Sequence, residues 1–176
     1  MRLDKEFFMD RADIVAKKLL GKIIVRKIGN KFFKAKIVET EAYFGKEDPA
    51  SRAVQNGDLR KTMEMGPGTI LVYGVHNNWL MNLVTGPEGK AEAVLLRALE
   101  PLNFKKKCNG PGLLTRAMRI NKAYHNKNIF NNKKIWIEDN KNQEKFEIAK
   151  SFRIGVRKDL PKKLRFYINN NPFISK

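Results

Sequence analysis

The sequence predicts an α+β fold in a single domain, residues 1–176, with a curved, largely antiparallel β-sheet flanked by helices. Several short β-rich runs are separated by turns, whereas apolar residues recur at helical spacing in only two segments. Because strands and helices do not alternate regularly, a parallel doubly wound sheet is not expected. With 176 residues, 42% apolar content and no linker or repeat, the chain suits one hydrophobic core.

Two helices are expected, one near each end of the first 120 residues. The first follows Asp10, a suitable N-cap, and its apolar residues keep helical spacing up to Gly21, which suits the C′ position. The second spans Pro111–Ile120 behind a Gly-Pro-Gly sequence. Between the two helices, the polar stretch Glu47–Pro67 predicts a long loop, and long loops in compact domains are usually functional or disordered.

The strands begin with a predicted hairpin, in which Lys22–Ile28 and Lys31–Glu41 flank the turn pair Gly29-Asn30. If the second strand stays regular, one face carries an apolar row that the carboxylates continue: Phe33, Ala35, Ile37, Glu39 and Glu41. Five further strands are expected: Ile70–Tyr73, Trp79–Val84, Ala91–Leu99, Ile135–Glu138 and Leu164–Ile168. The segments 74–78 and 85–89 are expected as turns.

The charge balance indicates a polyanionic partner. There are 36 Lys and Arg against 18 Asp and Glu, a formal net charge of +18, and the basic residues are spread along the whole chain. Such a distribution favours nucleic acid, because Lys and Arg displace counterions from a phosphate backbone. A membrane is not expected, since no apolar run approaches the ~20 residues that span a bilayer. A charge that serves only solubility, or an RNA-coating protein, remains an alternative.

The cysteine and histidine content limits the chemistry. Cys108 is the only cysteine, so no intramolecular disulfide forms, and a buried or incidental thiol is favoured over a nucleophile. We expect an intracellular protein, located in the cytoplasm or nucleoid if the source is a prokaryote, because the N-terminus M-R-L-D-K-E-F-F lacks the apolar region of a signal peptide. With only two histidines and one cysteine, a zinc site is not expected. The sequence also has no glycine-rich phosphate loop for a nucleotide cofactor, because both Gly-Pro-Gly sequences are typical of turns.

A family resemblance rests on segments distributed over nearly the whole chain. They are I-V-E-T-E-A-Y (37–43), E-D-P-A-S (47–51), P-G-T-I-L-V-Y (67–73), M-N (81–82), L-L-R-A-L-E-P-L (95–102), C-N-G-P-G-L-L-T-R-A-M-R-I-N (108–121), R-I-G-V (153–156) and L-R-F-Y (164–167). In this order they resemble the alkyladenine DNA glycosylases, the 3-methyladenine excision enzymes of the mammalian type.

The resemblance implies a monofunctional DNA glycosylase of base excision repair. Such an enzyme flips an alkylated or deaminated purine (the 3-methyladenine, 7-methylguanine and hypoxanthine class) out of duplex DNA. It then hydrolyses the N-glycosidic bond and leaves an abasic site. The implied fold is similar to the C-terminal domain of methionyl-tRNA formyltransferase. The implied partner is double-stranded DNA with a damaged purine, bound without a cofactor and, most simply, by a monomer.

By the resemblance, Glu41 is the general base that activates the attacking water. Arg97 is similar to the family arginine that helps to hold this water; the alternative is a partner that only neutralises Glu41 or Glu100. Ile154 occupies the place whose backbone carbonyl completes the water site.

The base pocket is implied by three further matches. Tyr43 and Tyr73 match the aromatic residues that sandwich the flipped base, and stacking suits an electron-poor alkylated purine. Asn82 matches a residue that discriminates among purine substituents. The alternatives are two tyrosines of the core and a strand-end hydrogen bond of Asn82.

The sequence departs from the family pattern at two places. Arg52 stands where the family normally has a histidine that contacts the purine. Arginine is a fixed cation that only donates hydrogen bonds, so it disfavours cationic lesions and favours neutral ones such as hypoxanthine. The alternative is that Arg52 swings out to bind a phosphate. After Tyr73 the loop is one residue shorter than the family turn whose tyrosine fills the space left by the nucleotide. Val75 and His76 are the candidates for this wedge, and His76 also suits a phosphate contact.

Two other classes of function remain. One is a basic, non-catalytic nucleic-acid-binding protein in which Glu41 is a structural partner of Arg97. The other is an RNA-directed module, given the similarity to the formyltransferase domain. The combination of Glu41, Arg97 and two tyrosines in one set of motifs favours the enzyme, because binding alone does not require it.

Overall fold

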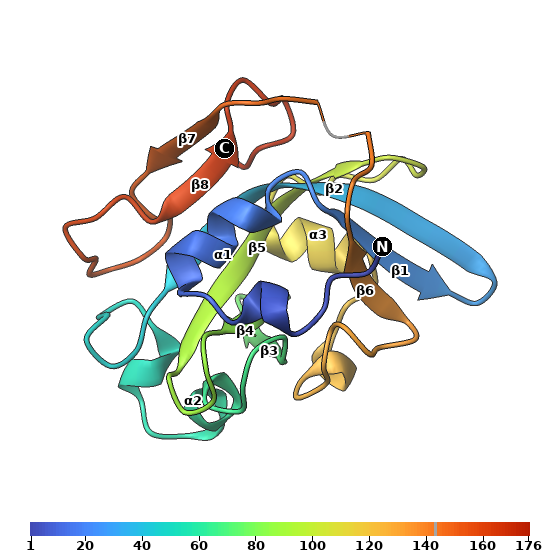
Figure 1. The fold of residues 1–176 in the computed structure, drawn as a ribbon. Coiled ribbons are helices and arrows are strands. Elements are labelled where there is room, and N and C mark those ends of the chain that lie inside the picture. Colours follow the sequence, from blue (N-terminus) through green and yellow to red (C-terminus); the bar gives the residue numbers. More distant parts are fainter. Residues whose placement is uncertain (143) are drawn as a thin grey trace.

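The computed structural model describes residues 1–142 and 144–176, and its framework is one eight-stranded sheet (Figure 1). The strands are β1 (Ile23–Ile28), β2 (Lys31–Tyr43), β3 (Ile70–Val75), β4 (Asn78–Thr85), β5 (Glu92–Pro101), β6 (Ile135–Glu138), β7 (Ile148–Ser151) and β8 (Arg165–Ile168). Their order is β3-β4-β5-β2-β1-β6, with β8 also paired to β2 and β7 paired to β8. Every pair is antiparallel, which confirms the predicted sheet.

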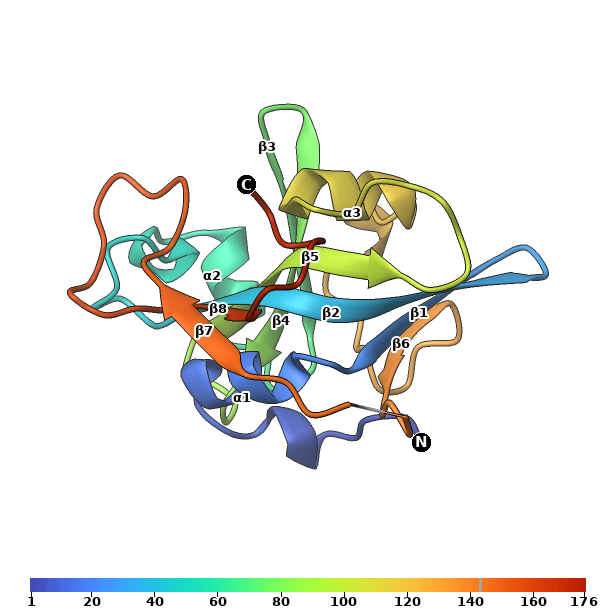
Figure 2. The ribbon, with the colours of Figure 1, turned by 90° about the horizontal axis from the view of Figure 1, so that it is seen from above.

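The helices are short. They are α1 (Ala12–Leu19), α2 (Asp58–Met63) and α3 (Pro111–Ala117), with 3₁₀ turns η1 (Glu6–Phe8), η2 (Arg52–Val54) and η3 (Lys122–Tyr124). Figure 2 shows α1 and α3 on opposite sides of β2 and β5. This arrangement confirms the α+β class. Across the described part of the chain, none of the helices has the length and apolarity that crossing a membrane requires.

The first helix begins one residue later than the N-cap prediction places it. Arg11 is the N-cap, and the backbone N–H of Ala12 donates to the carboxylate of Glu92 at 2.8 Å. The predicted cap, Asp10, instead pairs with Lys18 on the helix surface. A distant carboxylate therefore replaces the local cap. At the other end Gly21 has a φ of 83°, so the predicted left-handed C′ glycine is confirmed.

Two hairpins are confirmed, and the second is tighter than the sequence predicts. Gly29, with a φ of 58°, turns the chain between β1 and β2. β3 and β4 are joined by only His76 and Asn77, whose φ values of 47° and 61° are typical of a two-residue type I′ turn. Besides the three 3₁₀ turns, the sequence does not predict one helix and one strand. Helix α2 lies inside the predicted long loop, and β7 lies in a largely polar region.

Strand β2 is not regular, so the condition for one continuous face along it is not met. The pairing with β5 shifts between Ile37 and Glu39 and again between Glu39 and Thr40, which marks β-bulges. Ile37 and Val38 are both buried in the main core cluster. Beyond this irregularity the hydroxyl of Thr40 donates to a carbonyl of α1, and Glu39 and Glu41 point to the other side. The carboxylates therefore do not continue the apolar row.

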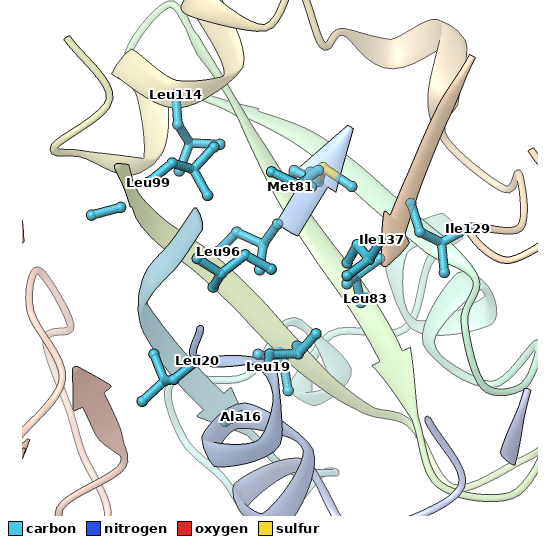
Figure 3. Packing of buried hydrophobic residues seen from close by; sticks show 14 of the residues in the cluster. Ala16, Leu19, Leu20, Met81, Leu83, Leu96, Leu99, Leu114, Ile129 and Ile137 are labelled. Carbon is cyan, nitrogen blue, oxygen red and sulfur yellow. The ribbon is translucent and has the colours of Figure 1, made fainter. Parts of the chain in front are cut away.

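The main core packs α1 and α3 against the curled sheet. Figure 3 shows Leu19 of α1, Leu96 and Leu99 of β5 and Leu114 of α3 within one buried cluster. A smaller cluster lies beneath the long loop, where Ala53 and Met63 pack against Leu71, Val84 and Ala93 of the sheet. This second cluster fixes the loop over the face of the sheet that carries the site residues.

Candidate active site

The matched residues meet on one face of strands β2 to β5. Glu41 of β2 is paired with Leu95 of β5, which is paired in turn with Asn82 of β4. Directly paired residues of a sheet project to the same face, and so do residues two apart on a strand. Tyr43 therefore shares this face with Glu41, and Tyr73 shares it because it lies two residues after the β3 partner of Asn82.

Glu41 is fully buried and is held at both carboxylate oxygens. Its Oε2 accepts from the hydroxyl of Tyr43 at 2.7 Å, and its Oε1 accepts from the backbone N–H of Ile154 at 2.8 Å. Nη1 of Arg97 lies 3.5 Å from the same Oε1. Burial raises the pKa of Glu41, and Arg97 and these two donors oppose the rise. The site thus holds a carboxylate with a raised proton affinity in a fixed orientation.

Arg97 joins two buried glutamates. It lies at the irregularity of β5, is 7% exposed, and its Nε donates to Oε1 of Glu39 at 3.1 Å. Glu100, the other partner considered from the sequence, instead pairs with Lys36 at 2.7 Å. Arg97 is thus an ion-pair partner of Glu41, and its position also suits a contact with a ligand of that carboxylate.

The role of Glu39 as the centre of a cluster was not foreseen. Its Oε1 accepts from Nε of Arg165 at 2.7 Å and from the hydroxyl of Ser175 at 2.6 Å, and its Oε2 accepts from the N–H of Ser175 at 2.6 Å. With Arg97 and Glu41, the cluster contains two carboxylates and two guanidinium groups. The charges balance, as a buried set of ions requires. Pairings over more than a hundred residues leave no local pattern in a sequence.

A second buried arginine supports Tyr43 and the segment after β7. Arg153 pairs with both oxygens of Asp48, at 2.6 and 2.7 Å, and donates to Asp159 through Nε at 2.9 Å. Its guanidinium carbon lies 4.5 Å from the centre of the Tyr43 ring. Burial lowers the pKa of Arg153, but the bonds to Asp48 and Asp159 outweigh burial and raise it, so the charge is permanent. Its neighbour Ile154 is thereby fixed with its N–H toward Glu41.

Tyr73, on the same face of the sheet, is contacted by Arg52. Arg52 lies in η2, capped by Ser51, and its guanidinium carbon is 4.7 Å from the centre of the Tyr73 ring. The departure from the family pattern is therefore located inside the site. Asn82 is buried, and its amide N–H donates to the carbonyl of Leu71 at 3.3 Å. That bond sets the orientation of its side chain.

Val75 and His76 lie apart from this cluster, at the end of the β3–β4 hairpin, which projects from the rest of the sheet (Figure 2). His76 is exposed and Val75 is half-buried. Cys108 is buried, as predicted, and burial raises its pKa to about 11, so the thiol is not activated. Within residues 1–142 and 144–176, no three His, Cys, Asp or Glu side chains are grouped as metal ligands.

Comparison with known proteins identifies the family. Residues 6–172 match the family model described as Methylpurine-DNA glycosylase. The chain belongs to the methylpurine-DNA glycosylase family. A protein of Aeropyrum pernix is 41% identical over 99% of this chain and 93% of its own length, and one of Clostridium tetani is 37% identical over the full length of both. A protein of Legionella pneumophila is 37% identical over 99% of this chain and 98% of its own.

These three relatives carry the same name, "Putative 3-methyladenine DNA glycosylase". Family membership confirms the resemblance found in the motifs, and with it the expected enzyme class, a DNA glycosylase of base excision repair that acts on DNA. It also places the motif residues in a family context, since all of them lie within the matched range.

Proposed function

We propose that this glycosylase excises alkylated or deaminated purines, of the 3-methyladenine, 7-methylguanine and hypoxanthine class, from duplex DNA and leaves an abasic site. The observation that carries the proposal is a fully buried carboxylate, Glu41, held by Tyr43, Ile154 and Arg97 on a face shared with a second tyrosine. A protein that only binds nucleic acid does not need this costly arrangement.

Access to the glycosidic bond requires that the nucleotide leaves the base stack. Extrusion costs a few kcal/mol and is easiest for a damaged or mispaired base. Tyr43 and Tyr73 then provide flat faces for the extruded purine, on the same side of the sheet as Glu41. The net charge of +18 attracts the phosphate backbone, and one copy of the chain is sufficient for one lesion.

The proposed chemistry is hydrolysis by an activated water. As the N-glycosidic bond breaks, its electron pair leaves with the purine, and the negative charge of Glu41 stabilises the cationic character that develops on the sugar. Glu41 accepts a proton from the water and directs the water oxygen to the anomeric carbon. A cationic purine leaves neutral, and a neutral purine takes up a proton from solvent as it leaves. The raised pKa of Glu41 makes the carboxylate a stronger base than an exposed one. Arg97 and the N–H of Ile154 restrain Oε1 while the water approaches.

The contribution of Ile154 has two parts. Its N–H donates to Glu41, and the family pattern assigns its carbonyl to the water. Both contacts come from the backbone, so the side chain, which is 37% exposed, is expected to tolerate substitution. The backbone of Ile154 is held in place by its neighbour Arg153, whose guanidinium donates to both oxygens of Asp48.

Arg52 is proposed to set the preference among lesions. A guanidinium that covers the ring of Tyr73 occupies a surface on which a purine stacks, so it has to move aside or lie next to the purine. Beside a cationic 3-methyladenine or 7-methylguanine it is repulsive, whereas it can donate to the acceptors of neutral hypoxanthine.

The test combines a product assay with a charge-neutral variant of Glu41. Duplexes with a single hypoxanthine or 7-methylguanine are incubated with the protein, and alkali-induced strand scission reports abasic sites. We expect Glu41→Gln to bind the damaged duplex normally but to lose at least about 10²-fold in excision rate. Glu88→Gln, at an exposed turn, is the matched control and should behave as the native protein.

Two outcomes would contradict the proposal. Native binding without scission on any of these lesions would favour the non-catalytic nucleic-acid-binding protein. Near-native excision by Glu41→Gln would remove Glu41 from the chemistry and leave it as a structural partner of Arg97.

A further inference from the structure

The last residues of the chain turn back over the sheet. In Figure 2 the C-terminal segment crosses β2 and β5 after leaving β8. It brings Ser175, which is only 7% exposed, into the buried cluster around Glu39. The family match ends at residue 172, so this serine lies outside the matched range.

Ser175 contacts both Glu39 and Arg97. Its hydroxyl lies 2.6 Å from Oε1 of Glu39 and 3.3 Å from Nη2 of Arg97. A hydroxyl has one proton, and an ionised carboxylate only accepts, so the proton goes to Glu39 and the oxygen accepts from Arg97. The backbone N–H of Ser175 donates to the other oxygen of Glu39 at 2.6 Å.

These contacts divide the donors of Arg97 among three acceptors. Nε donates to Glu39, Nη2 donates to Ser175, and Nη1 is left for Glu41. A guanidinium next to a carboxylate otherwise prefers a bidentate pair. Without the serine oxygen, Nε and Nη2 can both turn to Glu39, and this rotation takes Nη1 away from Glu41.

We propose that Ser175 is a positioning residue for excision: it holds Arg97 in the orientation in which Nη1 faces Glu41. The inference rests on the proposed role of Glu41. It assigns a function in the reaction to a segment that follows the family-matched residues, and it requires no contact between Ser175 and the substrate.

The test is the pH profile of single-turnover excision for Ser175→Ala. Arg97 opposes the rise in the pKa of Glu41, so a misdirected Arg97 leaves Glu41 protonated up to higher pH. We expect the acidic limb of the profile to move to higher pH and the rate near neutrality to fall about tenfold, with DNA binding unchanged. Ser151→Ala is the matched control, because Ser151 accepts from Arg165 at 3.0 Å but does not contact Arg97.

Two further variants separate positioning from folding. Ser175→Thr retains the hydroxyl and should restore the native limb. Ser175→Cys keeps a side chain of similar size, but its thiol is a weak donor and acceptor, so it should shift the acidic limb as Ser175→Ala does. This variant remains informative if Ser175→Ala lowers the melting temperature. In an Arg97→Lys background, Ser175→Ala should produce no additional shift, since the proposed effect passes through the guanidinium.

The proposal is overturned if folded Ser175→Ala and Ser175→Cys keep the native pH profile, or if Ser151→Ala shifts it equally. These results differ from a failure of the proposed function, which would appear in the native protein or in Glu41→Gln and not in the serine variants.

Discussion

The hydroxyl of Tyr43 donates a 2.7 Å hydrogen bond to Oε2 of Glu41. The two residues are two apart on β2 and therefore share a face, so the local geometry of one strand joins a proposed stacking residue to the proposed base. Burial and then the charge of Glu41 raise the pKa of Tyr43 far above its usual range. The phenol therefore remains protonated and acts as a donor at every working pH.

This contact predicts a pH dependence. Glu41 must be ionised to accept a proton, and burial raises its pKa. As the pH is lowered, the excision rate should therefore begin to fall at a higher pH than for an enzyme whose glutamate has an ordinary pKa. Tyr43→Phe keeps the ring but removes a bond that stabilises the carboxylate, so the acidic limb should move about one pH unit further up. Single-turnover excision between pH 5 and 9 measures the acidic limb for the native protein and for Tyr43→Phe. A limb that Tyr43→Phe leaves in place would show that the hydroxyl does not act on Glu41.

A second prediction concerns the buried pair of Arg153 and Asp48. Asp48→Ala leaves a buried guanidinium with Asp159 alone, so we expect a loss of about 3–5 kcal/mol in the free energy of unfolding. Asp10→Ala is the control: it removes one partner of the surface pair with Lys18 and should cost less than about 1 kcal/mol. Urea denaturation at pH 7 measures both. Equal losses for the two variants would contradict a structural role for Asp48.

The elements that sequence patterns specify locally were predictable. Gly29 and Gly21 are turn and C′ residues because their φ values are positive, and the β-rich runs around them became β1 and β2. The spacing of Glu41 and Tyr43 placed them together because a strand alternates faces. The resemblance to a family supplied Arg97 and Ile154, which the structure brings to the same carboxylate.

The features that were missed depend on distant partners. The bulges that turn Glu39 and Glu41 away from the apolar row arise from the pairing of β2 with β5, which periodicity within β2 does not encode. Ser175 joins Glu39 across 136 residues, and Arg153 joins Asp48 across 105. The sequence predicts a loop where helix α2 forms, because its six residues are mostly polar and only Thr62 and Met63 are buried.

A third prediction tests the specificity assigned to Arg52. Arg52→His replaces a fixed cation over Tyr73 by a ring that is neutral above its ordinary pKa of about 6.5. The ratio of hypoxanthine excision to 3-methyladenine and 7-methylguanine excision should fall severalfold, because the repulsion of cationic purines is removed. Arg157→His, in an exposed loop, is the control. An unchanged ratio with weaker binding and a smaller salt dependence would instead assign Arg52 to a phosphate contact.

The final prediction distinguishes Val75 from His76 as the wedge. Val75 is the last residue of β3 and lies two residues after Tyr73, so its side chain projects from the face that carries Tyr73 and Glu41, whereas His76 lies in the turn and is exposed. A side chain fills the gap left by an extruded nucleotide only if it approaches from the side on which the base is held. We therefore expect Val75→Ala to lower excision from duplex DNA severalfold while excision from single-stranded DNA stays unchanged, since no stack has to be held open there. His76→Ala should lower the affinity for both substrates at most modestly. Fluorescence of 2-aminopurine beside the lesion reports extrusion directly, and a loss of extrusion in His76→Ala alone would assign the wedge to the histidine.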